Sequence, residues 1–255
     1  MTSLRQALER AAASGVVLVA SDYDGTLAPI VANPDLAHPD ARALPALVSL
    51  GTLADTHAAI LSGRDAAVLR RLTGAPTGVE LVGSHGAERN GCLPQVEAQA
   101  REDLAAVQVR LAALCDKFPG SRLEVKPAGV AFHYRNVAAA LHPTAQASAR
   151  RIGLGFPGLT ILLGKRVVEL AGSTTNKGHA LLALRDRWAA DVVVYIGDDV
   201  TDEDAFAALR PDDVGVKVGA HPTRAEFRVD DQTQVSAVLE SLLSLRRDRQ
   251  VVRRA

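Results

Sequence analysis

The chain has 255 residues, of which 47% are hydrophobic and 23% are charged, and this ordinary globular composition excludes a disordered or fibrous protein. The 29 basic residues balance the 29 acidic residues. The formal net charge is therefore zero, and no overall field directs the protein toward nucleic acid or a membrane surface.

Cysteine content and the N-terminus indicate the kind of protein and its compartment. Two cysteines, Cys92 and Cys115, are too few for a disulfide framework. The first residues, MTSLRQALERAAAS, are typical of a polar amphipathic helix start and lack an apolar signal core. No apolar run approaches the roughly 18 residues of a membrane helix. We therefore expect a cytoplasmic protein with no nucleic-acid or membrane partner. The sequence does not determine the oligomeric state, and a monomer is the default expectation.

The first part of the chain alternates between short apolar strands and helices. Strands are predicted at 16–20, 57–62 and 79–84, and helices at 40–55 and 65–72. The first strand, VVLVA, is apolar throughout, which is typical of a strand buried on both faces of a parallel sheet. The alternation predicts an α/β fold, a Rossmann-like parallel sheet with helices on both faces.

The middle third changes to a different pattern. A helix at 97–117 precedes a predicted hairpin, RLEVK and VAFHYR joined by PAG, and a helix at 139–152 precedes a second hairpin, LTILLGKRVVEL. Two helix–hairpin pairs do not continue a parallel sheet. They predict a smaller inserted α+β domain at 97–171, between two parts of the α/β core at 1–96 and 172–255.

The last part returns to the α/β pattern. Helices and strands alternate again, with helices predicted at 176–188, 201–209 and 234–245 and strands at 191–197 and 213–219. The chain ends in a basic stretch, LRRDRQVVRRA, with five arginines. We interpret this stretch as a solvated helix end with a frayed tail.

Polar motifs occupy the places where the predicted strands end. In open parallel α/β sheets, ligands bind outside the carboxyl ends of the strands. Each motif alone also has a structural interpretation as a turn, a helix cap or a surface residue. Four of them at strand–helix junctions favour one shared site instead, formed by Asp22 and Asp24; by Ser62, Gly63 and Arg64; by Lys177; and by Asp198, Asp199 and Asp202.

The residue types in these motifs predict phosphoryl chemistry. Carboxylates at this density need a cation, and oxygen ligands favour hard metals, Mg²⁺ first among them. Ser62, Lys177 and backbone N–H groups could hold a phosphate. Asp22 could attack phosphorus and form an aspartyl-phosphate. Asp24, on the same side one pleat further, could exchange protons with the leaving oxygen and with water.

These motifs resemble those of a known family. DYDGTL, SGR, NKG and GDDVTDEDAF resemble the four motifs of haloacid-dehalogenase (HAD) superfamily phosphatases. More narrowly, DYDGTLAPI, GSHGAE, LEVK with VAFHYR, and VVEL resemble the trehalose-6-phosphate phosphatase family. The resemblance implies a HAD core with an inserted cap. It also implies hydrolysis of trehalose 6-phosphate to trehalose and phosphate through an aspartyl-phosphate.

The resemblance also implies roles for residues of the core. Asp22 would be the nucleophile and Asp24 the general acid and base. Mg²⁺ would be held by the side chains of Asp22 and Asp198 and by the backbone carbonyl of Asp24. Asp199 and Asp202 would act beside the metal, orienting its waters and the lysine. The phosphoryl oxygens would be bound by Ser62, Gly63 and Lys177, with Arg64 lining the pocket.

For the inserted domain, the resemblance implies a cap that closes over the sugar. Glu124 and Lys126 share a strand face, and together with Glu169 they would contact sugar hydroxyl groups, since they offer both donors and acceptors. The structural alternative is cross-strand charge pairing on a solvated sheet face. His85, in GSHGAE, is interpreted as a loop or supporting residue rather than a catalyst.

Other functions stay open at this stage. The cap could serve sucrose phosphate or a glycosylglycerate phosphate, or the enzyme could be a phosphomutase. A phospho-accepting signalling module also combines an acidic pocket, a hydroxyl and a lysine on a parallel α/β sheet. Such a module needs about half this length and no inserted domain, so a phosphatase is the favoured hypothesis.

Overall fold

The structure is a computed structural model, and it describes residues 3–89 and 96–254, so Cys92 lies outside the described residues. The chain forms two compact units, one from Met1–Gly86 with Asn176–Ala255 and the other from Ala87–Thr175. The domain limits expected from the sequence, 97 and 171, lie inside the second unit. Among the described residues, no helix combines the length and the apolar character needed to cross a membrane.

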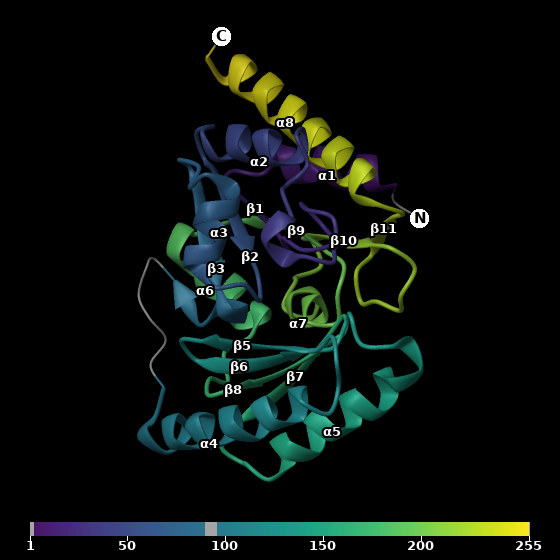
Figure 1. Ribbon diagram of the computed structural model, residues 1–255. Coiled ribbons are helices and arrows are strands. Elements are labelled where there is room, and N and C mark those ends of the chain that lie inside the picture. The colour runs from purple at the N-terminus through teal and green to yellow at the C-terminus, as the bar shows by residue number, and fades with distance from the viewer. Residues whose placement is uncertain (1–2, 90–95, 255) are drawn as a thin grey trace. The chain divides into compact units, whose positions relative to one another are not determined.

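A parallel sheet forms the centre of the first unit, as predicted, with helices on both of its faces (Figure 1). Six parallel strands lie in the order β11-β10-β9-β1-β2-β3. β11 was not predicted, because three residues are too few to show a period. The strands span Val17–Ser21 (β1), Thr56–Leu61 (β2), Val79–Gly83 (β3), Val192–Gly197 (β9), Val214–Val218 (β10) and Phe227–Val229 (β11).

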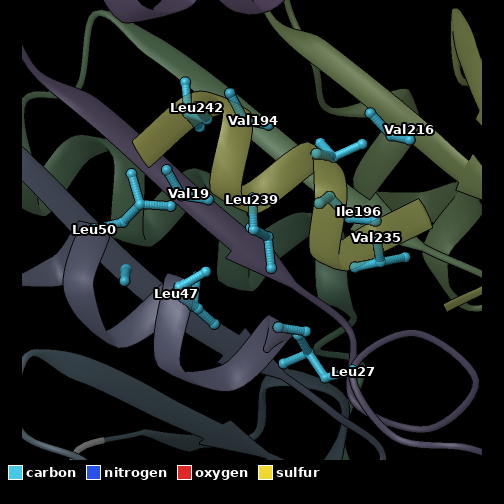
Figure 2. Packing of buried hydrophobic residues seen from close by; sticks show 14 of the residues in the cluster. Val19, Leu27, Leu47, Leu50, Val194, Ile196, Val216, Val235, Leu239 and Leu242 are labelled. Carbon is cyan, nitrogen blue, oxygen red and sulfur yellow. The ribbon is translucent and has the colours of Figure 1, made fainter. Parts of the chain in front are cut away.

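Side chains alternate along β1 between two apolar layers. Val17 and Val19 pack with α1 (Leu4–Ala13), α2 (Ala43–Gly51), α3 (Ala66–Thr73) and α8 (Gln232–Arg254). Leu18 and Ala20 pack with α6 (Lys177–Trp188) and α7 (Asp202–Ala207) on the opposite face. Every residue of β1 is buried, which explains the uninterrupted apolar run from Val17 to Ala20. Figure 2 shows the first layer, where α2 and α8 meet the sheet through Val19, Leu47, Leu50, Val194, Ile196, Val235, Leu239 and Leu242.

Helix α2 begins later than predicted. The predicted helix starts at residue 40 and contains Pro45 in its interior, whereas α2 starts at Ala43. Pro45 is therefore the third helical residue, where the backbone N–H has no intrahelical partner to lose. The chain also forms short 3₁₀ turns at Pro34–Leu36, Ser84–Gly86 and Ala139–Leu141 and a two-residue strand, β4, at Glu88–Arg89.

The second unit contains a four-stranded antiparallel sheet, ordered β5-β6-β8-β7. One face of the sheet is apolar, and its side chains pack in one cluster with α4 and α5. The helix–hairpin–helix–hairpin order agrees with the sequence pattern, and its elements are α4 (Ala98–Cys115), β5 (Arg122–Lys126), β6 (Gly129–His133), α5 (His142–Leu154), β7 (Thr160–Gly164) and β8 (Val167–Ala171).

The expectation of a solvated basic tail is wrong for Arg246. Helix α8 continues through Arg254, and the Arg246 side chain is only 2% exposed. Its guanidinium donates to the carbonyls of Ser14 at 2.9 Å and Asp55 at 2.7 Å, and to the Thr56 hydroxyl at 3.0 Å. A guanidinium has five N–H donors, and loop carbonyls can satisfy them as well as water can. The sequence could not show which of the two an arginine would meet.

We predict that Arg246→Gln lowers the free energy of unfolding by about 3 kcal/mol, because part-buried loop carbonyls and the buried Thr56 hydroxyl lose a charged donor. Arg247→Gln, one residue further on an exposed position, is the matched control and should change stability by less than about 0.5 kcal/mol. Urea unfolding can be followed by the fluorescence of Trp188, the single tryptophan, which lies in α6. Equal urea midpoints for the two variants would contradict a stabilising role for the Arg246 hydrogen bonds.

Candidate active site

Three buried carboxylates meet at the carboxyl end of the parallel sheet. Asp22 follows β1, Asp198 follows β9 and Asp202 begins α7. One oxygen from each carboxylate lies within 4.8 Å of the others. Strands β1 and β9 are neighbours, and the Asp22 N–H donates to the Ile196 carbonyl at 2.8 Å, so the sheet itself holds two of the carboxylates together.

Lys177 joins this cluster from the first turn of α6. Its ammonium donates to Asp22 Oδ1 at 2.6 Å and to Asp202 Oδ1 at 2.8 Å. The side chain of Asn176 caps the helix by accepting from the His179 N–H at 2.9 Å. This N-cap fixes the start of α6 and thereby places Lys177 beside the carboxylates at the end of the sheet.

Two glycines permit the close packing of this cluster. A Cβ on Gly25 would lie 2.0 Å from Asp198 Oδ2, and Gly25 has a φ of +88°. A Cβ on Gly178 would lie 2.5 Å from the Asp204 carbonyl oxygen. The glycines of DYDGTL and NKG are thus required by the approach of other segments to their backbone.

Asp202 holds the loop after β9 in place. Its Oδ2 accepts the N–H groups of Asp198 at 2.9 Å and Asp199 at 2.8 Å. Its Oδ1 accepts from Lys177 and, at 2.7 Å, from the Tyr195 hydroxyl. Four donors therefore engage Asp202, so its role here is to orient its neighbours rather than to bind a cation.

Burial and the neighbouring carboxylates disfavour the ionised form of Asp22. Burial raises the pKa of Asp22 well above its ordinary value, the charges of Asp202 and Asp198 raise it further, and Lys177 offsets only part of this. Burial alone would lower the pKa of Lys177, but Asp202 and Asp22 raise it, so the lysine stays charged. For Asp202, Lys177 and the hydrogen bonds outweigh burial and lower the pKa.

The donor set fits a hard divalent cation. Asp22 and Asp198 supply buried carboxylate oxygens, the ligand type that Mg²⁺ prefers. A cation beside them would favour the ionised form of Asp22, against the burial and the neighbouring carboxylates that raise its pKa. The cluster can therefore bind a metal, and the carbonyl of Asp24 follows Asp22 by two residues in the same turn.

Asp24 and Arg64 form a bidentate ion pair that the sequence did not suggest. Arg64 Nε and one terminal nitrogen each lie 2.6 Å from an oxygen of Asp24. The other terminal nitrogen donates to the Pro34 carbonyl at 2.9 Å, and the guanidinium lies 5.5 Å from the centre of the Tyr23 ring. Asp24, expected to transfer protons, is thus held by Arg64, expected to line the pocket.

Ser62 lies at the end of β2, next to the strand that carries Asp22. The register pairs Ser21 with Ile60, so Asp22 and Ser62 leave neighbouring strands at similar levels. The buried Ser62 hydroxyl accepts from the Arg64 N–H at 3.1 Å, across Gly63. His85 donates its backbone N–H to the Ser62 carbonyl at 2.9 Å, which agrees with a supporting position beside this loop.

The three sugar-contact candidates all lie in the second unit, on β5 and β8. Lys126 and Glu169 form an ion pair, so cross-strand charge pairing is present on this sheet. Glu124 is bonded instead to His133, with its Oε2 2.6 Å from the ring Nε2.

Two supporting residues escaped the sequence reasoning. Tyr195 is fully buried in β9 and donates to Asp202. Lys217 is 1% exposed in β10, and its ammonium donates to the Asp199 carbonyl and to Glu203, both at 3.1 Å. The sequence did contain a signal for both residues. Tyr195 in VVVYIG and Lys217 in VGVKV carry polar groups within otherwise apolar strands, and such groups need hydrogen-bond partners when the strand is buried on both faces.

Several known proteins to which this chain is similar carry trehalose-phosphatase names. A family model described as trehalose-phosphatase matches residues 20–234. The bifunctional trehalose-6-phosphate synthase/phosphatase of Thermoproteus tenax is 37% identical over 235 residues, which cover 88% of this chain but only 32% of that protein. The trehalose-6-phosphate phosphatase of Escherichia coli K12 is 34% identical over 227 residues, covering 87% of this chain and 84% of that protein. The solved C-terminal domain of the C. albicans trehalose-6-phosphate phosphatase has the same fold, with a TM-score of 0.82, 24% identity and coverage of 95% and 97%.

We predict that Mg²⁺ alone raises the melting temperature of the wild-type protein, by about 5 °C at a hundredfold excess over its Kd. Asp198→Asn removes a proposed ligand and should abolish this rise. Asp186→Asn, an exposed position on α6, is the control that should keep it. An undiminished rise in Asp198→Asn would place the metal elsewhere.

Proposed function

Because the chain belongs to the trehalose-phosphatase family, we propose that it is a Mg²⁺-dependent phosphatase that hydrolyses trehalose 6-phosphate to trehalose and phosphate. The observation that carries the proposal is the buried cluster of Asp22, Asp198 and Lys177 at the strand ends, inside the matched range. This cluster combines a nucleophile, a cation site and a fixed positive charge.

Asp22 is the nucleophile of the proposed reaction. Its carboxylate oxygen bonds to phosphorus while the bond between phosphorus and the sugar oxygen breaks, and Asp24 gives a proton to that oxygen. Water then attacks the aspartyl-phosphate, and Asp24 takes the proton. Phosphate leaves, and both carboxyl groups return to their starting states.

Charged groups around Asp22 support these steps. Lys177 is already bonded to Asp22 at 2.6 Å, and its charge, with Ser62 and Gly63 on the neighbouring strand end, suits the phosphoryl oxygens. Asp22, Asp198 and the Asp24 carbonyl would hold Mg²⁺, which when bound offsets the charge of the carboxylates and the phosphoryl group.

Asp24 must leave its ion pair in order to act. Both of its oxygens accept from Arg64 in this arrangement, so the carboxyl faces the guanidinium rather than a leaving group. In our proposal the carboxyl turns from Arg64 to the sugar oxygen when substrate binds. Arg64 then faces the substrate side of the pocket.

The second unit is the proposed substrate-specificity cap, corresponding to the expected domain at 97–171. Glu124, Lys126 and Glu169 lie on one face of its sheet and offer carboxylate acceptors and ammonium donors. A sugar hydroxyl both donates and accepts, so such a set can bind several hydroxyl groups of one disaccharide.

A substrate panel tests the reaction and the sugar. With Mg²⁺, we expect phosphate release from trehalose 6-phosphate to exceed that from sucrose phosphate, a glycosylglycerate phosphate and glucose 6-phosphate by about a hundredfold or more in kcat/KM. A chelator should abolish release, and Asp22→Asn should lower kcat by at least about 10³-fold, with Asp186→Asn as control. Comparable rates on unrelated sugars would overturn the trehalose assignment.

The covalent step has its own signature in the Asp24→Asn variant. With p-nitrophenyl phosphate, the leaving group needs no proton, so the first step should survive while hydrolysis of the aspartyl-phosphate loses its base. Stopped-flow absorbance should then show a burst of one nitrophenolate per enzyme, followed by slow turnover. Linear release without a burst, at wild-type rate, would rule out this role for Asp24. A signalling module would instead keep the phosphoryl group for hours, even in the wild-type protein.

A further inference from the structure

The polar face of the second unit's sheet has a regular arrangement. Glu124 on β5 lies opposite Ala131 on β6, and Ala131 lies opposite Glu169 on β8. Two carboxylates therefore stand in one row, two strands apart, which is about 10 Å. Between them β6 places the small residues Gly129 and Ala131 on this face, with His133 at the end of the strand, so Lys126 from β5 and Glu169 from β8 can meet above the small residues.

Each of the two carboxylates has its own partner. Lys126 pairs with Glu169 across β6, and the Cβ that Gly129 lacks would lie 3.2 Å from Glu169 Oε1. Glu124 pairs with His133, whose Nε2 lies 2.6 Å from Glu124 Oε2. The Lys126 and Glu169 side chains are 6% and 7% exposed, whereas Glu124 and His133 are 26% and 28% exposed. The Glu124–His133 pair is therefore the more accessible of the two pairs on this face.

The protonation of this pair can be assigned. The pKa of Glu124 is lowered, first by the hydrogen bond from His133, so Glu124 is a carboxylate at neutral pH. An ionised carboxylate only accepts hydrogen bonds, and His133 must therefore carry the proton on Nε2 and donate it. With Oε2 occupied in this way, the plane of the carboxylate is set and Oε1 presents its lone pairs to a hydroxyl donor.

We propose that His133 is a specificity-determining positioning residue, which holds Glu124 so that its carboxylate accepts a hydroxyl group of the substrate's sugar. The proposal rests on the proposed function as a disaccharide phosphatase. His133 belongs to VAFHYR, a motif to which the reaction scheme assigns no role.

Variants at position 133 give a graded test. His133→Leu removes the donor and should raise KM for trehalose 6-phosphate about tenfold or more, because a hydrogen bond to a charged group is lost. His133→Gln retains an N–H donor and should stay within about threefold of wild type. Turnover of p-nitrophenyl phosphate, which has no sugar, should be unchanged in both. Arg122→Gln removes a half-exposed cation 3.8 Å from the same Glu124 oxygen and is the control for charge alone. A KM for Arg122→Gln raised as much as in His133→Leu would overturn the proposal.

A double-mutant cycle with Glu124→Gln separates positioning from a structural role. If His133 acts through Glu124, adding His133→Leu to Glu124→Gln should raise KM by no more than about twofold further. Additive effects, or an equal loss with p-nitrophenyl phosphate, would overturn the proposal. If the wild-type protein turns over trehalose 6-phosphate and His133→Leu has the same KM, the role of His133 is overturned and the proposed function stands. If the wild-type protein does not turn over trehalose 6-phosphate, the proposed function is overturned together with the role of His133.

Discussion

The first unit is organised around one electrostatic constraint, the burial of three carboxylates beside a single ammonium. Asp22, Asp198 and Asp202 meet where β1, β9 and α7 converge, and Lys177 bridges two of them. Carboxylates out of water repel one another and are stable only with compensating charge. The lysine and the hydrogen bonds lower the pKa of Asp202, whereas burial and the neighbouring carboxylates keep the pKa of Asp22 raised. A bound cation would favour the ionised form of Asp22, which is the form that the proposed reaction needs.

Much of the surrounding structure serves to hold this cluster in place. Asp202 ties down two backbone N–H groups of the loop after β9, while Tyr195 and Lys217 anchor the same segment from the strands below it. Because the strands are buried on both faces, the Tyr195 hydroxyl and the Lys217 ammonium cannot reach water and must form hydrogen bonds within the protein. Side chains deep in the sheet therefore set the geometry of groups at its edge.

The sheet of the second unit has one apolar face and one charged face. One face is apolar and packs on α4 and α5, so the other can carry charge. The small residues Gly129 and Ala131 keep the middle of that face low, and this lets Lys126 and Glu169 meet across a strand. Charge pairing does not exclude the sugar binding proposed for this face, because an ion pair orients the same carboxylate that a hydroxyl would approach.

The sequence by itself determined the fold class, the order of the longer elements and the residues of the cluster, because these depend on local patterns: apolar strands, helix periods and short motifs at strand ends. Tertiary structure alone decided the partners. The bidentate bond between Asp24 and Arg64 joins residues 40 apart, the His133–Glu124 bond depends on strand register, and Arg246 meets loop carbonyls far along the chain. A charged side chain has the same appearance in a sequence whether it ends in water, in an ion pair or on a backbone carbonyl. Only packing, which removes the water, makes the choice.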